Sequence, residues 1–164
     1  MRALLCWLLL ASVTLAGGEA GVDEFPIKDF FFSWHVETSD AAQLSIRKTP
    51  KGTTVDIRYL FPCYLGCDIS LTPDQAAAVG KVLARTNAFH ERMLETRDAS
   101  EKVAAGKDCR VEFRTDKTGR FEAAIFLGEN PIPLTLDREA ANTFAPPLQK
   151  AVELAKRVDE KVRF

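Results

Sequence analysis

The sequence predicts an α+β protein made of two β-β-β(β)-α repeats, with curved antiparallel sheets and helices packed around one core. Three observations lead to this prediction: apolar residues alternate in several segments, two segments carry helix-start signals, and two blocks of sequence recur in the same order. The chain has 164 residues, of which 46% are hydrophobic and 27% charged, and its net charge is −1. This composition is typical of a globular protein and excludes disordered, collagen-like and coiled-coil chains.

Residues 1–20 are typical of a secretory signal peptide. The single basic residue Arg2 precedes an apolar run over residues 3–15, and small residues follow that run. The run is too short to cross a bilayer of about 30 Å as a helix, but it suits the apolar core of a signal peptide. Cleavage fits after Ala16 or after Ala20. We therefore expect an exported protein, periplasmic or secreted, with no membrane span in the mature chain.

Alternation of apolar and polar residues predicts strands in both halves of the remaining chain. Gly52 and Gly119 each separate two such segments, and glycine suits a turn because it adopts positive φ without a Cβ clash. One further segment, residues 30–36, gives the first half an extra strand. The alternating segments are residues 30–36, 44–46, 55–59, 109–115 and 121–127.

Helix-start signals follow the strands of each half. Thr72 can cap a helix, Pro73 suits its first position, and Gln75 closes a capping box. The second helix is expected to start near residues 135–137 and to break or kink at residues 146–147, which are both proline. The resulting order is β-β-β-β-α-β-β-β-α. It places these residues in the core: Val79, Val82, Leu83, Phe89, Val111, Phe113, Ile125, Leu134 and Leu148.

The two halves also match each other in sequence. Residues 44–52 match residues 111–119 at an offset of 67, and residues 69–78 match residues 132–141 at an offset of 63. Matching order and spacing favour an internal duplication over chance. We predict that Gly52 is equivalent to Gly119 and Thr72 to Thr135. The predicted boundaries are residues 21–94 for the first repeat, 95–107 for a helical tail or linker, and 108–164 for the second repeat.

The strand, turn and helix motifs of the first repeat resemble the single-stranded-DNA-binding coactivator family called positive cofactor four. The second repeat is similar to repeats of the purine-rich-element-binding (Pur) and whirly proteins. The matching residues are 44–47, 51–52, 56–58 and 69–75 in the first repeat, and 117–121 and 134–136 in the second. The resemblance implies β-β-β-β-α units with helices against curved sheets, and such short motifs indicate a fold better than a function.

The same resemblance implies that basic and aromatic side chains on the sheet surface would bind single strands of nucleic acid. Three acidic residues interrupt the basic positions, namely Asp56, Glu112 and Asp116, and the net charge is slightly negative. Both facts, together with the expected export, disfavour nucleic acid as the partner. The candidate binding residues under this resemblance are Arg47, Lys51, Arg58, Arg114, Lys117 and Arg120.

Three cysteines follow the signal segment: Cys63, Cys67 and Cys109. In an oxidising compartment one disulfide is expected, and one thiol is left over. We expect Cys63 to pair with Cys67, with Cys109 reduced and buried, while a bridge to Cys109 would instead join the repeats. Two thiolates with His35 or His90 as a third ligand would suit copper, although each histidine is more simply a surface residue.

No catalytic or cofactor motif is present, since the chain has neither a G-x-S-x-G turn nor a glycine-rich phosphate loop. The leading hypothesis is an exported, non-enzymatic binding or assembly module that uses its sheet surface or sheet edges. A protein partner or a second copy would pair with such an edge. The alternatives are a single-stranded nucleic-acid-binding protein and, third, a thiol or copper protein acting through Cys63 and Cys67.

Overall fold

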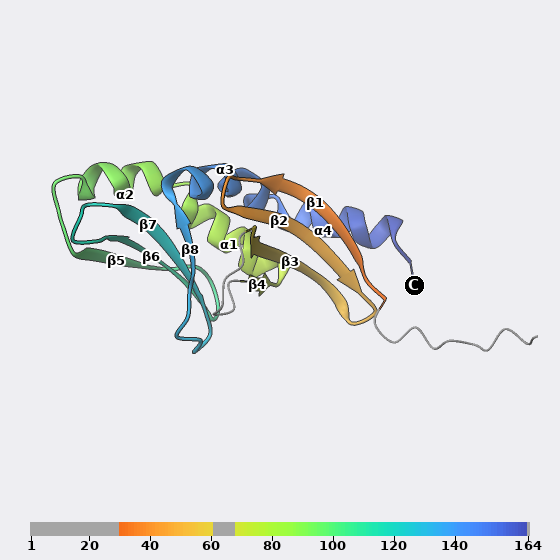
Figure 1. Cartoon of the computed structure of the whole chain (residues 1–164). Helices are drawn as coiled ribbons and strands as arrows, with labels where there is room; N and C mark the ends of the chain where they lie inside the picture. The colour runs from red at the N-terminus through yellow and green to blue at the C-terminus, as the bar shows by residue number, and fades with distance from the viewer. Residues whose placement is uncertain (1–29, 61–67, 164) are drawn as a thin grey trace, which may run out of the picture.

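The computed structural model describes residues 30–60 and 68–163, which form one elongated molecule (Figure 1). Within these residues there are two four-stranded antiparallel sheets and four helices, and the helices cover one face of both sheets. This arrangement confirms the predicted α+β class with two β-rich repeats. The described part of the chain contains no helix with the length and apolar character needed to cross a membrane.

Both sheets follow chain order, β1-β2-β3-β4 in the first and β5-β6-β7-β8 in the second. The first sheet consists of β1 (Phe32–Thr38), β2 (Ala42–Thr49), β3 (Gly52–Tyr59) and β4 (Asp68–Leu71). The second consists of β5 (Ala99–Ala104), β6 (Cys109–Thr115), β7 (Phe121–Leu127) and β8 (Leu134–Asp137). Four helices complete the fold: α1 (Pro73–Leu83), α2 (Thr86–Met93), α3 (Arg138–Gln149) and α4 (Ala151–Lys161).

One face of each sheet is apolar and packs against the helices. In the first sheet Leu44 and Ile46 of β2 pair with Ile57 and Val55 of β3, and all four side chains are buried. Alternation therefore places the opposite residues of these strands on the outer face of the sheet. All nine predicted core residues are buried, from Val79 in α1 to Leu148 in α3.

The helical tail predicted over residues 95–107 is wrong, because residues 99–104 form strand β5. These residues are mostly exposed, and alanine, glutamate and lysine are depleted in strands, so neither propensity nor alternation indicates a strand. The strand forms because it pairs along its whole length with β6, from Ala99 opposite Thr115 to Ala104 opposite Arg110. Both repeats therefore have four strands, and the second begins at β5 rather than at residue 108.

The helix-start prediction at Thr72 is confirmed in detail. The Thr72 hydroxyl accepts from the Gln75 N–H, the Gln75 side chain accepts from the Thr72 N–H, and Pro73 is the first residue of α1. The helix that begins after Thr72 ends at Leu83, and a second helix, α2, begins at Thr86.

In the second repeat Asp137 caps α3 by accepting from the Ala140 N–H at 2.8 Å. Pro146 and Pro147 lie inside α3, so the break predicted at this pair is displaced along the chain. The interruption falls at Lys150, whose N–H bonds to the Pro147 carbonyl before α4 begins.

The predicted equivalence of Thr72 and Thr135 is wrong by two residues. The residues that cap the first helix of each repeat are Thr72 and Asp137, which are 65 positions apart, whereas Thr135 lies within β8. When two strands are aligned two residues out of register, apolar positions still match apolar positions, because side chains alternate with a period of two. The sequence match between the repeats therefore did not reveal the error. Gly52 and Gly119 do lie at the corresponding turn of each sheet, with φ of 140° and 87°.

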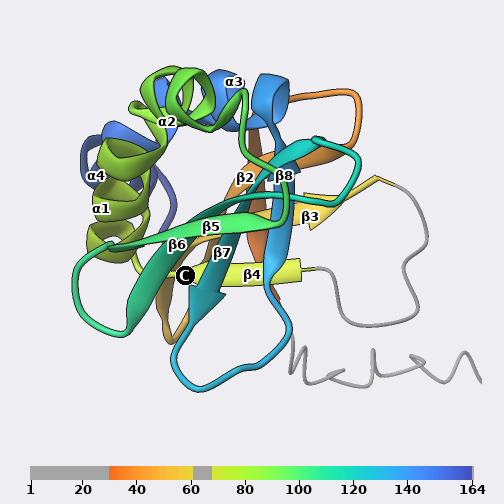
Figure 2. The ribbon, with the colours of Figure 1, turned by 90° about the vertical axis from the view of Figure 1, so that its left-hand side faces the viewer.

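The two repeats exchange their second helices. Helix α2 of the first repeat packs on β6 and β7, and α4 of the second repeat packs on β2 and β3. Between them α1 and α3 cross in close contact, and Figure 2 shows all four helices gathered on one side of the strands. At this crossing Gly80 is essential, because a Cβ there would lie 2.5 Å from the Gln149 nitrogen. The repeats thus share one core and form one interlocked unit.

A tyrosine joins the two sheets at a strand edge. The Tyr59 hydroxyl, at the end of β3, donates to the Thr135 carbonyl of β8 and accepts from the Thr135 N–H at 3.0 Å. Burial raises the pKa of Tyr59 above its ordinary value of 10.0. Through these two hydrogen bonds, a side chain of the first repeat satisfies the backbone N–H and carbonyl of Thr135 on the free edge of β8.

Candidate functional site

The outer face of the first sheet brings together two of the predicted basic residues. Arg47 of β2 lies with its guanidinium carbon 4.4 Å from the centre of the Phe31 ring, while Arg58 of β3 forms an ion pair of 2.9 Å with Asp68. The Nε atom of Arg47 is buried and has no hydrogen-bond partner within the described residues. A hollow of about 170 Å³ surrounds these two arginines, and Asp56 also lines it. Arg47 forms no ion pair within the described residues, whereas the charge of Arg58 is neutralised by Asp68.

The outer face of the second sheet is balanced in charge. Arg114 of β6 forms an ion pair with Glu122 of β7, and Lys102 of β5 lies 3.9 Å from Glu112 of β6. Such cross-strand pairs leave little net positive potential for a polyanion. Arg114 is thus placed on a sheet face as predicted, but its charge is compensated by a neighbour.

The remaining basic candidates lie in hairpin turns at opposite ends of the molecule (Figure 1). Lys51 is in the β2–β3 turn, while Lys117 and Arg120 are exposed in the β6–β7 turn. The second turn is organised by Asp116, whose carboxylate accepts from the Thr118 hydroxyl and from backbone N–H groups, and these bonds lower the pKa of Asp116. The six predicted nucleic-acid ligands therefore do not form one continuous surface.

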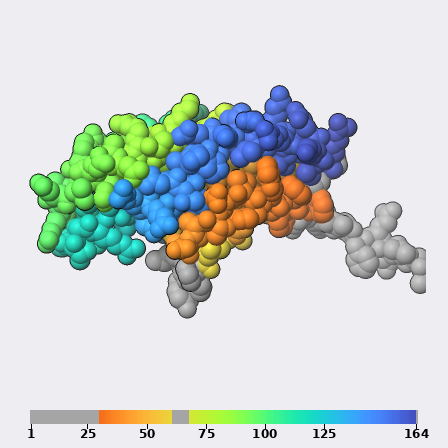
Figure 3. All heavy atoms as spheres, turned by 90° about the horizontal axis from the view of Figure 1, so that it is seen from above, coloured from red at the N-terminus to blue at the C-terminus, as the bar shows by residue number. Residues whose placement is uncertain are grey.

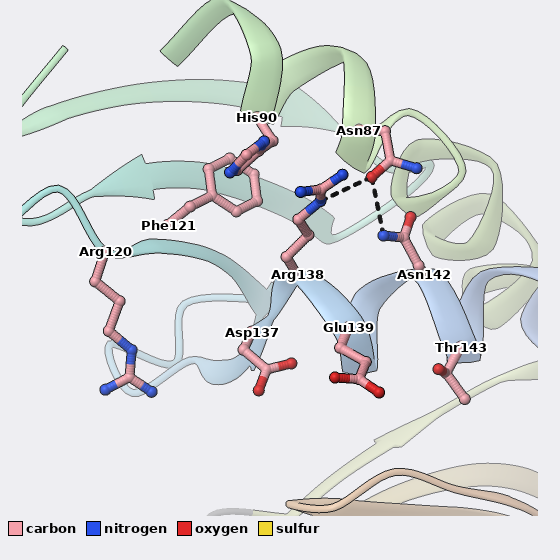
Figure 4. Close-up of a pocket in the computed structure, with 9 residues that line it drawn as sticks. All are labelled: Asn87, His90, Arg120, Phe121, Asp137, Arg138, Glu139, Asn142 and Thr143. Carbon is pink, nitrogen blue, oxygen red and sulfur yellow. Dashed lines mark hydrogen bonds between the residues drawn. The ribbon is translucent and has the colours of Figure 1, made fainter. Parts of the chain in front are cut away.

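An open cleft of about 680 Å³ lies between α2, the start of α3 and the β6–β7 turn (Figure 4). The Asn87 side-chain oxygen accepts from Arg138 at 3.0 Å and from Asn142 at 3.1 Å. The His90 ring meets the Phe121 ring edge-on, with centroids 5.2 Å apart. Sequence patterns gave no signal for this cleft, because its residues come from three separated segments.

The chemistry of this cleft is limited by bonds that its own side chains already make. Asp137 is used as the helix cap, Arg138 is held by Asn87, and among the described residues no carboxylate bonds to His90. A general base oriented by a carboxylate is the usual sign of nucleophilic catalysis, and that arrangement is not formed here. The cleft can accept a polar molecule but does not define a reaction.

The four sheet edges differ in how they are protected, and an unprotected edge is a natural site for strand pairing. The edge of β8 is bonded by Tyr59. Strand β5 carries Glu101 and Lys102, which form ion pairs with Arg92 and Glu112. Strand β4 has four residues and includes the charged Asp68. Strand β1 has no charged residue from Phe32 to His35, and within the described chain its backbone there bonds to no element other than β2.

Large aromatic side chains are concentrated at the start of β1. Phe30 and Phe31 are 54% and 49% exposed, and Phe32 and Trp34 are both 38% exposed. Since Trp34 lies opposite the buried Ile46, it shares with Phe32 the helix-facing side of the sheet. Phe31 lies on the outer face under Arg47. Figure 3 shows β1 along one long side of the molecule, beside α3 and α4.

An apolar groove continues from the edge of β1 on the helix-facing side. Its volume is about 370 Å³, and it lies between Phe32 and Trp34 of β1 and Val158 at the end of α4. Arg157 and Lys161 line the same groove. Helix α4 is fixed beside the first sheet because Asp159 of α4 binds Lys48 of β2 and Thr53 of β3. These contacts lower the pKa of Asp159.

The predicted disulfide and metal residues are only partly described. Cys63 and Cys67 lie outside the described residues, as does the predicted signal segment. Cys109 is a free, buried thiol at the start of β6, and burial together with Asp108 raises its pKa. His35 bonds to Gln43 at 2.7 Å and to Thr38 at 2.9 Å. Among the described residues no three side chains form a cluster that could hold a metal ion.

The class that fold and surface define is an α+β protein of two interlocked repeats, with an aromatic sheet edge that no other part of the described chain covers. The chain matches no known family model and no curated protein. Its function is therefore argued from this edge.

Proposed function

We propose that this protein is an exported, non-enzymatic binding module that accepts an extended segment of a partner protein along strand β1. The segment would add a fifth strand to the first sheet. Main-chain hydrogen bonds would supply affinity, and alternate side chains would supply specificity. Export is part of the proposal and is supported by the signal-like residues 1–20.

The observation that carries the proposal is the contrast between β1 and the other edges. Natural sheets protect their edges with charges, short strands or covering groups, and β8, β5 and β4 have such protection. Strand β1 instead exposes Phe32 and Trp34 on its helix-facing side, and Phe31, directly before the strand, is exposed on the outer side. Exposed apolar clusters beside a free edge are typical of protein-interaction sites.

The experiment selects peptides from a random displayed library and then measures binding of synthetic copies to the chain without residues 1–20. That chain retains Trp34 as its single tryptophan, because the other, Trp7, lies in the removed segment. We expect binding to shift the emission of Trp34 and to slow amide exchange at residues 32–35. Peptides that bind without moving either signal would overturn the proposal.

Matched variants on two edge strands sharpen this test. Ser33 of β1 and Ser100 of β5 are both exposed and both lie on the outer faces of their sheets. Aspartate disfavours strand pairing and places a charge on the edge. Ser33→Asp should abolish peptide binding, whereas Ser100→Asp should leave it within about two-fold. Equal effects of the two substitutions would contradict binding at β1.

Single-stranded nucleic-acid binding is the second candidate, and one observation favours it. Arg47 is stacked on an aromatic ring and has no ion-pair partner among the described residues, as a base-stacking site would require. Binding should then weaken steeply with salt. Joint replacement of Arg47, Arg58, Arg114 and Arg120 by alanine should abolish it. Failure to bind single strands at low salt would eliminate this candidate.

A further inference from the structure

We infer that the segment accepted at β1 alternates large apolar side chains with acidic ones, and this inference rests on the proposed function. Residues of an added strand point alternately to the helix-facing side and to the outer face of the sheet. The two faces of β1 present different chemistry, so they select different side chains at alternate positions.

The helix-facing side selects large apolar side chains. An added strand lies about 4.8 Å beyond β1, so its inward side chains come beside Phe32 and Trp34 at the apolar groove. Val158 closes the far wall, and it is 4% exposed. Leucine-sized side chains would remove the exposed parts of both aromatic rings from water.

The outer face selects an acidic side chain through Arg47. This residue stands on β2 opposite Ser33, yet its guanidinium lies over the Phe31 ring, toward the free edge. Its buried Nε has no partner in the described chain, and a buried unsatisfied donor is unusual enough to require an explanation. The terminal nitrogens of the same guanidinium form no ion pair within the described residues, and a glutamate of the added strand, on the same face as Phe31, would bond to them in a charge-assisted contact.

Other charges near the edge agree with this selection. Lys161 lines the groove and forms no ion pair within the described residues, so the helix-facing side is also slightly cationic. Asp56 is on β3, where its carboxylate accepts from the Thr54 hydroxyl at 2.9 Å, and it is two strands removed from the edge. The irregularity of pairing between His35 and Glu37 ends the regular edge and limits the added strand to a few residues.

The experiment uses three capped heptapeptides in which leucine alternates with glutamate, with serine or with lysine. Binding to the chain without residues 1–20 is followed by Trp34 emission. We expect the glutamate peptide to bind at least ten-fold more tightly than the serine peptide, and the lysine peptide to bind weakest. Arg47→Glu should reverse the order of the glutamate and lysine peptides. The matched control Arg58→Glu should keep the original order, because Arg58 is paired with Asp68.

The outcomes separate this inference from the proposed function. If all three peptides shift Trp34 with equal affinity, strand addition stands and the acidic selection is overturned. If none shifts Trp34 while library-selected peptides do, the alternating pattern is overturned. If Trp34 reports only self-association, seen as a dimer by sedimentation that peptides do not dissociate, the occupant is a second copy and the inference fails.

Discussion

Substitution of Gly80 by alanine tests whether the two repeats interlock through the α1–α3 crossing. In an ordinary helix this change is stabilising by about 1 kcal/mol, because glycine has greater freedom to lose on folding. At this position an added Cβ would lie 2.5 Å from the Gln149 nitrogen and 2.8 Å from the Leu148 carbonyl carbon. Both are backbone atoms, so no side-chain rotation relieves the contact.

The expected magnitude follows from these opposing effects. Overpacking in a well-packed core costs about 1–3 kcal/mol, and a clash with backbone lies at the upper end of that range. After subtraction of the propensity gain, Gly80→Ala should destabilise the fold by about 2 kcal/mol. The corresponding fall in melting temperature is about 4–8 °C for a protein of this size.

Chemical denaturation of the chain without residues 1–20 measures this change directly. Lys81→Ala is the matched control, since Lys81 is exposed on the next position of the same helix and its replacement should alter stability by at most about 0.5 kcal/mol. A stabilised Gly80→Ala protein would refute the reasoning, because it would mean that α1 and α3 do not approach each other at Gly80.

Three further predictions concern the core, the sheet junction and the cysteines. Phe113→Ala should cost about 3–5 kcal/mol in denaturation, because Phe113 is fully buried; a loss below about 1 kcal/mol would place it outside the core. Tyr59→Phe should cost about 1–2 kcal/mol at neutral pH. Since folding raises the pKa of Tyr59, the unfolded state ionises first, and this difference should shrink as the pH rises above 10.0. Peptide mapping without reduction should find Cys63 linked to Cys67, and linkage to Cys109 would contradict this.

The parts of the fold that could be predicted are those whose signal is local. The capping box at Thr72 and the alternating apolar residues of β6 follow from short-range chemistry, and the structure contains both as predicted. Strand β5 could not be predicted, because its residues have low strand propensity and form a strand only by pairing with β6. The two-residue error between Thr72 and Thr135 arose because a shift of two leaves the buried face of a strand unchanged.

The candidate surface was predicted only in outline. Aromatic alternation over residues 30–36 indicated a strand, and sheet edges were expected to mediate assembly. Which edge is unprotected depends on contacts between distant residues, such as Tyr59 with the edge of β8. Ion pairing likewise makes Arg58 different from Arg47. The charge of Arg58 on β3 is neutralised by Asp68, which lies on the neighbouring strand β4. Charge partners across strands are a property of register, which the sequence pattern left open.

The interlocked helices give a physical reason why β1 can remain unprotected without disturbing the fold. An edge strand with exposed aromatic residues is a liability when it is loosely held, because it then pairs with any free strand. Here β2, the one strand paired with β1, is fixed from the other repeat, since Asp159 of α4 binds Lys48. Breaking that contact by Lys48→Met, which leaves the bond between Thr53 of β3 and Asp159 in place, should therefore loosen the edge of β1 more than the rest of the sheet. Amide exchange at residues 32–35 should quicken relative to β3, and uniform exchange across the sheet would contradict this coupling.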